Sequence, residues 1–163
     1  MANILLNLLA ARSGGQITRA SAFLKRINKF SPQDNYIVLK DGKVFNDLPS
    51  NDKLSFINIS FGNGKMKVVK RFLWENFLLP KMIKDKKINL YLSFSHYLPN
   101  FINHIPSVVG ITNLAPFSKE AIKSEKLFVK IKLKLLKKTI LSSAKKSTTV
   151  IAISNECNNI LID

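Results

Sequence analysis

The first thirty residues constrain the fold of this chain more than any other stretch of its sequence. They begin with a nearly continuous apolar run, formed by Ile4, Leu5, Leu6, Leu8 and Leu9. Such a run is typical of a strand that is covered on both faces. Ser13-Gly14-Gly15 interrupts the run, and the apolar residues of segment 16–30 then recur with helical spacing. The pattern predicts a buried strand, a glycine turn and a helix.

The glycine turn is a candidate binding site. Two adjacent glycines permit positive φ angles and let a ligand approach the backbone closely. A helix that begins beside them presents free N–H groups and the positive end of its dipole, which suits a phosphate or sugar hydroxyls. Gly14, Gly15 and Gln16 are therefore candidate substrate-binding residues; a turn that binds nothing is the alternative. No third glycine completes a G-x-G-x-x-G fingerprint before Gly42, which disfavours dinucleotide binding.

Composition limits the classes of partner and site. The chain has 163 residues, of which 46% are hydrophobic, so we expect one domain with a real core. Its net charge of +16 favours an anionic partner such as a membrane surface, nucleic acid or a phosphorylated substrate. The single Cys157 excludes an internal disulfide and fits a reducing compartment, which predicts a cytoplasmic protein. One cysteine and two histidines cannot build a zinc site, so we expect no metal.

Strand and helix patterns alternate along the rest of the chain. Apolar runs predict strands over 36–39, 54–60, 88–94, 108–112 and 148–153, and Asp41-Gly42 predicts a hairpin with a return strand over 43–45. Helical periodicity covers 65–84, which Pro80 kinks or ends, and 119–146, and Ser154 is placed to cap a last helix. The alternation predicts an α/β fold over 1–163: a single Rossmann-like, doubly wound and mostly parallel sheet.

A doubly wound sheet binds ligands beyond the carboxyl ends of its strands, where the strand order reverses. We expect this reversal between the first strand and the strand over 88–94. The glycine turn would then face the loop that carries His96, a candidate ligand-binding histidine. Thr112 and Asn113 follow the next strand and offer uncharged donors and acceptors for sugar hydroxyls. The alternatives are a structural or surface role for His96 and a simple turn at 112–117.

The predicted helix over 119–146 is strongly basic. It contains ten lysines and two glutamates, a net charge of +8, which is half that of the whole chain. A basic stripe at i+4 spacing consists of Lys126, Lys130, Lys134 and Lys138. Such a helix can lie on anionic lipid, so these lysines are candidate membrane-contact residues. An ordinary packing helix with a solvated lysine face is the alternative, and nucleic acid is not expected because no platform of interleaved aromatic and basic residues accompanies the lysines.

The order of these segments resembles the N-terminal domain of a GT-B glycosyltransferase of the retaining group 1 (family 4) type. The resemblance is carried by ILLNLLAARSGGQITRASAFL, LYLSFSHYLPNF, PSVVGITNLAPFSKEA and KKSTTVIAISNECNNILI. It implies that Gly14 and Gly15 line a cleft near the donor phosphate and acceptor, and that His96 lies near the transferred sugar. Thr112 and Asn113 stand where many members of the family have His-Asp, so the histidine contact is replaced here.

The resemblance also implies an incomplete enzyme. In this family a second Rossmann domain holds the nucleotide-sugar, and no such domain follows Asp163 in this sequence. We therefore expect part of a glycosyltransferase that moves a sugar from a nucleotide-sugar to a glycan or lipid-linked acceptor, with a second domain or subunit as partner. No cofactor is expected beyond that donor substrate. The alternative is a non-catalytic α/β module that docks on an anionic membrane, at its inner face, or on a partner glycosyltransferase subunit.

Overall fold

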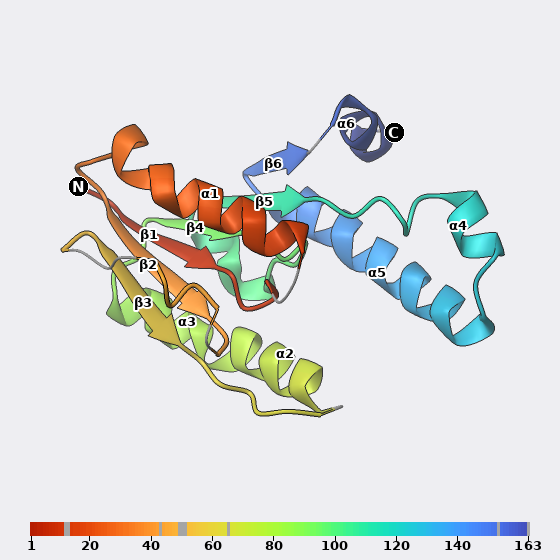
Figure 1. Ribbon diagram of the computed structural model, residues 1–163, viewed down its shortest axis with the longest axis horizontal. Helices are drawn as coiled ribbons and strands as arrows, with labels where there is room; N and C mark the ends of the chain where they lie inside the picture. Colours follow the sequence, from red (N-terminus) through yellow and green to blue (C-terminus); the bar gives the residue numbers. More distant parts are fainter. Residues whose placement is uncertain (12–13, 43, 49–51, 65, 153, 163) are drawn as a thin grey trace.

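The strand predicted at the start of the chain lies inside a six-stranded, all-parallel sheet (Figure 1). The computed structural model describes residues 1–11, 14–42, 44–48, 52–64, 66–152 and 154–162. Its elements are β1 (Asn3–Asn7), α1 (Gly15–Phe30), β2 (Asn35–Lys40), β3 (Leu54–Asn58), α2 (Lys67–Phe77), α3 (Leu79–Asp85), β4 (Leu90–Ser93), the 3-10 helix η1 (Asn100–His104), β5 (Ser107–Ile111), α4 (Lys119–Lys123), α5 (Leu127–Lys146), β6 (Thr149–Ala152) and α6 (Asn155–Ile162).

The strand order is β3-β2-β1-β4-β5-β6, which confirms a Rossmann-like, doubly wound sheet. β1 pairs with β2 on one side and with β4 on the other, so that Leu5 lies opposite both Ile37 and Tyr91. The chain therefore reverses its direction of strand addition between β1 and β4. This is the position that the sequence predicted for the switch point.

Residues that alternate along the first strand pack on opposite faces of the sheet. Leu6 and Leu8 belong to a core cluster with three residues of α1: Ala20, Leu24 and Ile27. Leu5 and Leu9 belong to a second cluster that includes Leu79 of α3 and Ile102 of η1. Leu5 and Leu6 are both fully buried, and burying a leucine contributes about 1.5–3 kcal/mol. Helices consequently cover both faces, as the near-continuous apolar run predicted.

The predicted strands are confirmed with small shifts at their ends, but the return strand over 43–45 is wrong. Lys43 lies outside the described residues, and residues 44–47 form a turn. Phe45 has φ of 67°, in the left-handed region that a strand residue does not adopt. β2 pairs instead with β3 in parallel.

Each of the two long predicted helices is divided in the structure. The first breaks at Leu78, and Pro80 lies in the first turn of α3, where its missing N–H costs no helical hydrogen bond. The second breaks over 124–126, and so the single helix predicted over 119–146 is wrong. There the Ser124 hydroxyl donates to the Ala121 carbonyl at 3.1 Å, a local bond that competes with helix continuation. The capping role of Ser154 is confirmed, since its Oγ accepts from Cys157 N at 3.1 Å.

A buried polar cluster joins the end of β1 to β4 and α2. The side-chain nitrogen of Asn7 donates to Glu75 Oε1 and to the Tyr91 hydroxyl, both at 2.7 Å, while its oxygen accepts from Leu9 N at 3.0 Å. Glu75 is only 1% exposed, and Arg71 forms an ion pair with it at 3.5 Å. Burial raises the pKa of Glu75, while Arg71 and the Asn7 hydrogen bond oppose that shift.

We expect the stability of the wild-type protein relative to Glu75→Gln to depend on pH. Because the folded-state pKa of Glu75 is raised, its contribution to stability is complete below about pH 4.5 and is lost as the pH rises through the folded-state pKa. The wild type should therefore gain stability relative to the variant as the pH falls from 7 toward 4.5. Urea denaturation measures the difference, with the exposed Glu125→Gln as control. A pH-independent difference would contradict burial of this charge.

Candidate functional site

The glycine turn opens α1 with a bare helix N-terminus. Gly14 has φ of 57° and ψ of −142°, a conformation that glycine adopts without strain. Among the described residues no side chain caps the helix, and its first turn contains no acidic residue, although the first N–H groups of a helix lack helical partners. An added Cβ at Gly14 would meet nothing within 4 Å. The space beside Gly14 is therefore open, whereas a Cβ added at Gly15 would lie 3.8 Å from a guanidinium nitrogen of Arg19. Ser13, also in the predicted turn, lies outside the described residues.

His96 is the most constrained residue at the end of β4. It has φ of 60° and is only 7% exposed. Its Nδ1 lies 3.2 Å from the backbone nitrogen of Thr112 and 3.1 Å from the Gly110 carbonyl oxygen. An unprotonated Nδ1 accepts from the Thr112 N–H and a protonated Nδ1 donates to the Gly110 carbonyl, so the ring makes one of these bonds at a time. Nε2 lies 3.3 Å from Thr112 Oγ1. A positive φ in a non-glycine residue is uncommon and persists where surrounding contacts fix it.

The charge state of His96 follows from its surroundings. Burial lowers the pKa of His96, the positive charge of Arg19 lowers it further, and the Gly110 carbonyl partly opposes the shift. The imidazole is consequently neutral near pH 7. A neutral ring with one donor and one acceptor nitrogen can exchange hydrogen bonds with a hydroxyl group, and Thr112 already makes such a contact through Oγ1.

The glycine turn and His96 lie at the same edge of the sheet. Asn7 and Ser93 are paired at the carboxyl ends of the parallel strands β1 and β4, and the two loops leave from these ends. Arg19 connects them, because its Nε donates to the Gly15 carbonyl at 3.0 Å while its charge acts on His96. Sequence reasoning did not single out Arg19. Its position four residues after Gly15, where a helical side chain returns above the turn, was the available signal.

The other predicted site residues differ in their surroundings. Thr112 contacts His96 directly, so these two residues form one unit. The Asn113 side-chain oxygen accepts from Ala115 N at 3.0 Å, which stabilises the local turn and supports the alternative considered for this segment. Gln16 is half-buried, and its side chain has no hydrogen-bond partner within the described part of the chain. The same edge thus presents backbone N–H groups and a guanidinium, with the buried imidazole of His96 held against Thr112 beside them.

The lysine stripe lies on a part of the structure that projects away from the sheet. Figure 1 shows α4 and the first half of α5 extending from the body of the domain; we call residues 119–135 the arm. α5 packs on the core from Leu136 onward, through Leu136, Ile140 and Ser143, and the Ser143 Oγ accepts from Leu98 N at 3.0 Å. Lys126, just before α5, Lys130 and Lys134 lie on the arm, whereas Lys138 lies beyond it.

The arm also carries exposed apolar side chains. The exposed fractions are 74% for Leu127, 79% for Phe128, 50% for Ile131 and 62% for Leu135. Ile140 follows Ile131 by nine residues, about two and a half turns, so the two lie on opposite sides of the helix at about 100° per residue. α5 is therefore apolar on its exposed side as well as on its core side. None of the helices in the described ranges is long and apolar enough to cross a membrane. Nor does any group of acidic, histidine or cysteine side chains there form a metal site.

The lowered pKa of His96 predicts the direction of a pH effect on stability. The unfolded chain takes up a proton near pH 6.5 while folded His96 resists it, so stability should fall as the pH drops through 6.5 and level off below the folded-state pKa. Denaturant unfolding between pH 8 and pH 5 measures this slope. His96→Gln should reduce the slope, whereas His104→Gln, at an exposed position, should leave it unchanged. Equal slopes in the wild type and in His96→Gln would contradict the attribution of this pH dependence to His96.

Comparisons with known proteins do not assign a family to this chain. No protein-family model matches it, and no curated protein matches it either. The all-parallel sheet and the shared carboxyl edge of β1 and β4 are features of the fold, and many unrelated activities use such folds. A function for this chain therefore has to be argued from the residues at that edge and on the arm.

Proposed function

We propose that the carboxyl edge between β1 and β4 binds the acceptor side of a sugar-transfer reaction, as part of a glycosyltransferase. The supporting observation is that a bare glycine-led helix N-terminus, Arg19 and the His96–Thr112 pair lie at one switch point. Backbone N–H groups and a guanidinium suit a phosphate, and the neutral imidazole with a threonine hydroxyl suits sugar hydroxyls. These groups bind and orient a substrate.

In this proposal a second domain or a partner chain supplies the donor site. The sugar would pass from a nucleotide-sugar to a glycan or a lipid-linked acceptor. The residues at the β1–β4 edge would contribute to the rate by holding the acceptor and one phosphate in position, while the partner would hold the nucleotide. The part of the site that this chain would contribute can be tested by measuring binding to this chain without that partner.

We expect UDP-glucose and inorganic pyrophosphate to shift the backbone amide signals of Gly14, Gly15 and Gln16 in an NMR titration. Arg19→Gln should weaken the binding by about tenfold, because one charge-assisted hydrogen bond is lost. Arg26→Gln is the matched control, since Arg26 is an exposed arginine farther along the same helix. The absence of shifts at 14–16, or an equal effect of both variants, would contradict a phosphate site at this turn.

A second function is favoured by the arm. We propose that it docks the protein on an anionic membrane surface, at the inner face of the membrane. Exposed apolar side chains beside lysines are the pattern of helices that lie in the lipid interface. Docking would bring the protein to the surface where lipid-linked acceptors reside. A non-catalytic module that binds a membrane through the same arm remains the alternative function.

We expect the protein to float with vesicles that contain phosphatidylglycerol and not with vesicles of phosphatidylcholine alone. Lys130→Glu with Lys134→Glu should reduce binding by at least about tenfold, because each lysine near an anionic surface contributes about 1 kcal/mol. Lys25→Glu with Lys29→Glu is the matched control: it reverses an exposed pair at the same spacing on α1. Equal binding to both kinds of vesicle, or an equal loss of binding in both double variants, would contradict docking through the arm.

A further inference from the structure

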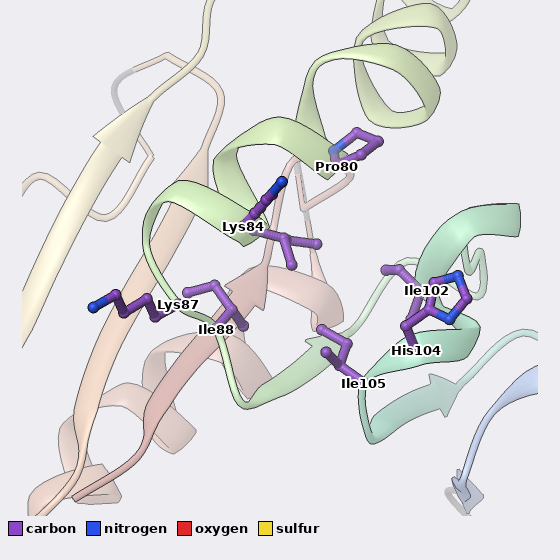
Figure 2. A pocket seen from close by; sticks show the side chains of 8 residues that line it. Pro80, Lys84, Lys87, Ile88, Ile102, His104 and Ile105 are labelled. Atoms are coloured by element: carbon purple, nitrogen blue, oxygen red, sulfur yellow. The ribbon is translucent and has the colours of Figure 1, made fainter.

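An apolar hollow lies at the edge of the sheet opposite to the candidate sugar site. It has a volume of about 390 Å³ and is bounded by α3 and η1, close to where β4 and β5 begin. Figure 2 shows Pro80 and Lys84 of α3 on one side and Ile102 and His104 of η1 on the other, with Ile88 and Ile105 below them. Its volume lies within the range of about 300–1,000 Å³ that is usual for small-ligand pockets.

The lining of this hollow is aliphatic. It is formed by Pro80 and four isoleucines: Ile83, Ile88, Ile102 and Ile105. Ile88 and Ile102 belong to the buried core, while Ile83 and Ile105 are half-buried and pack against it. Apolar surface of this kind gains free energy when a hydrocarbon chain covers it, at about 25 cal/mol per Å². The hollow therefore favours a ligand with an aliphatic part.

The rim of the hollow is positively charged. Lys84, Lys87 and His104 complete the lining, and the described lining residues include no acidic side chain. Within the described ranges neither lysine forms an ion pair. Figure 2 shows Lys87 extending away from the hollow, so a change of rotamer is needed for its ammonium group to reach a ligand there. A negatively charged head group is the complement of this rim.

Backbone hydrogen bonds fix the rim in place. Lys87 N donates to the Lys84 carbonyl at 3.1 Å, and Ile88 N donates to the Ile83 carbonyl at 3.0 Å. The Asn3 side chain donates to the Lys86 carbonyl at 2.9 Å, which ties this turn to the start of β1. Lys87 has φ of 48°, a conformation that these bonds hold. The rim is thus a formed feature of the fold.

We propose that this hollow binds a short aliphatic anion, with its hydrocarbon chain over the isoleucines and its carboxylate or phosphate head at Lys84 and Lys87. The aliphatic lining favours a hydrocarbon chain in the ligand, and the cationic rim favours a negative charge on its head group. This site is separate from the proposed sugar site, because it lies where β4 and β5 begin whereas the sugar site lies where β1 and β4 end. The two proposals can therefore fail independently.

A titration with octanoate, followed by NMR of the isoleucine methyl groups, tests the proposal. The methyl signals of Ile83, Ile88, Ile102 and Ile105 should shift with saturation, with a Kd of the order of 1 mM, while that of Ile140 should not shift. Octanol has a chain of the same length without the charge and should bind at least about tenfold more weakly. Octyl phosphate, in a parallel titration, shows which head group the rim prefers.

Two matched double variants test whether the lysines of the rim, and not other lysines nearby, bind the negative charge of octanoate. Lys84→Ala with Lys87→Asn should weaken octanoate binding by about tenfold and leave octanol binding unchanged; asparagine is chosen because it tolerates positive φ. Lys81→Ala with Lys86→Asn removes the same charge from the same region outside the hollow and should have little effect. The proposal is overturned by absent methyl shifts, by octanol binding as tightly as octanoate in the wild type, or by equal effects of the two double variants.

Discussion

The burial of β1 on both faces is the constraint on which the rest of this structure depends. A strand that pairs with β2 and β4 and packs under helices on either side has its register fixed, since a slip by one residue would move every side chain to the wrong face. Its last residue, Asn7, then becomes the point where β1, β4 and α2 are joined through Tyr91 and Glu75. The glycine turn and the His96 loop follow the paired ends of β1 and β4, so the pairing of these two strands determines where both loops lie.

Glu75 and His96 are buried ionisable groups near this junction, and burial shifts their pKa values in opposite directions. It raises the pKa of Glu75 and lowers the pKa of His96, so both groups are moved toward their neutral forms. A neutral imidazole is compatible with the nearby Arg19, whereas a charged one would repel it. The edge between β1 and β4 therefore concentrates positive potential in Arg19 and the N-terminus of α1, and leaves His96 as an uncharged hydrogen-bonding partner.

The sequence allowed the sheet and its switch point to be predicted because apolar runs report burial directly. The helix break near Pro80 was also predicted, because a proline disrupts a helix interior. The break after Lys123 was not predicted: the Ser124 hydroxyl bonds to the preceding turn there, and periodicity does not reveal such a bond. The same limit applies to the site. The shared edge followed from strand order, but the Asn7–Glu75 bond joins residues 68 positions apart, and the His96–Thr112 contact depends on a single positive φ. Neither contact can be predicted from the sequence alone.

Few of the positive charges are compensated by described ion pairs. The described ion pairs, Lys67 with Asp41 at 2.9 Å and Arg71 with Glu75 at 3.5 Å, occupy a small part of the chain's 26 basic residues. A net charge of +16 without compensation weakens the folded state through self-repulsion. An anion bound at the glycine turn, at the arm or at the apolar hollow would relieve part of that repulsion. Such binding would couple to stability, because a ligand that prefers the folded protein stabilises it by mass action.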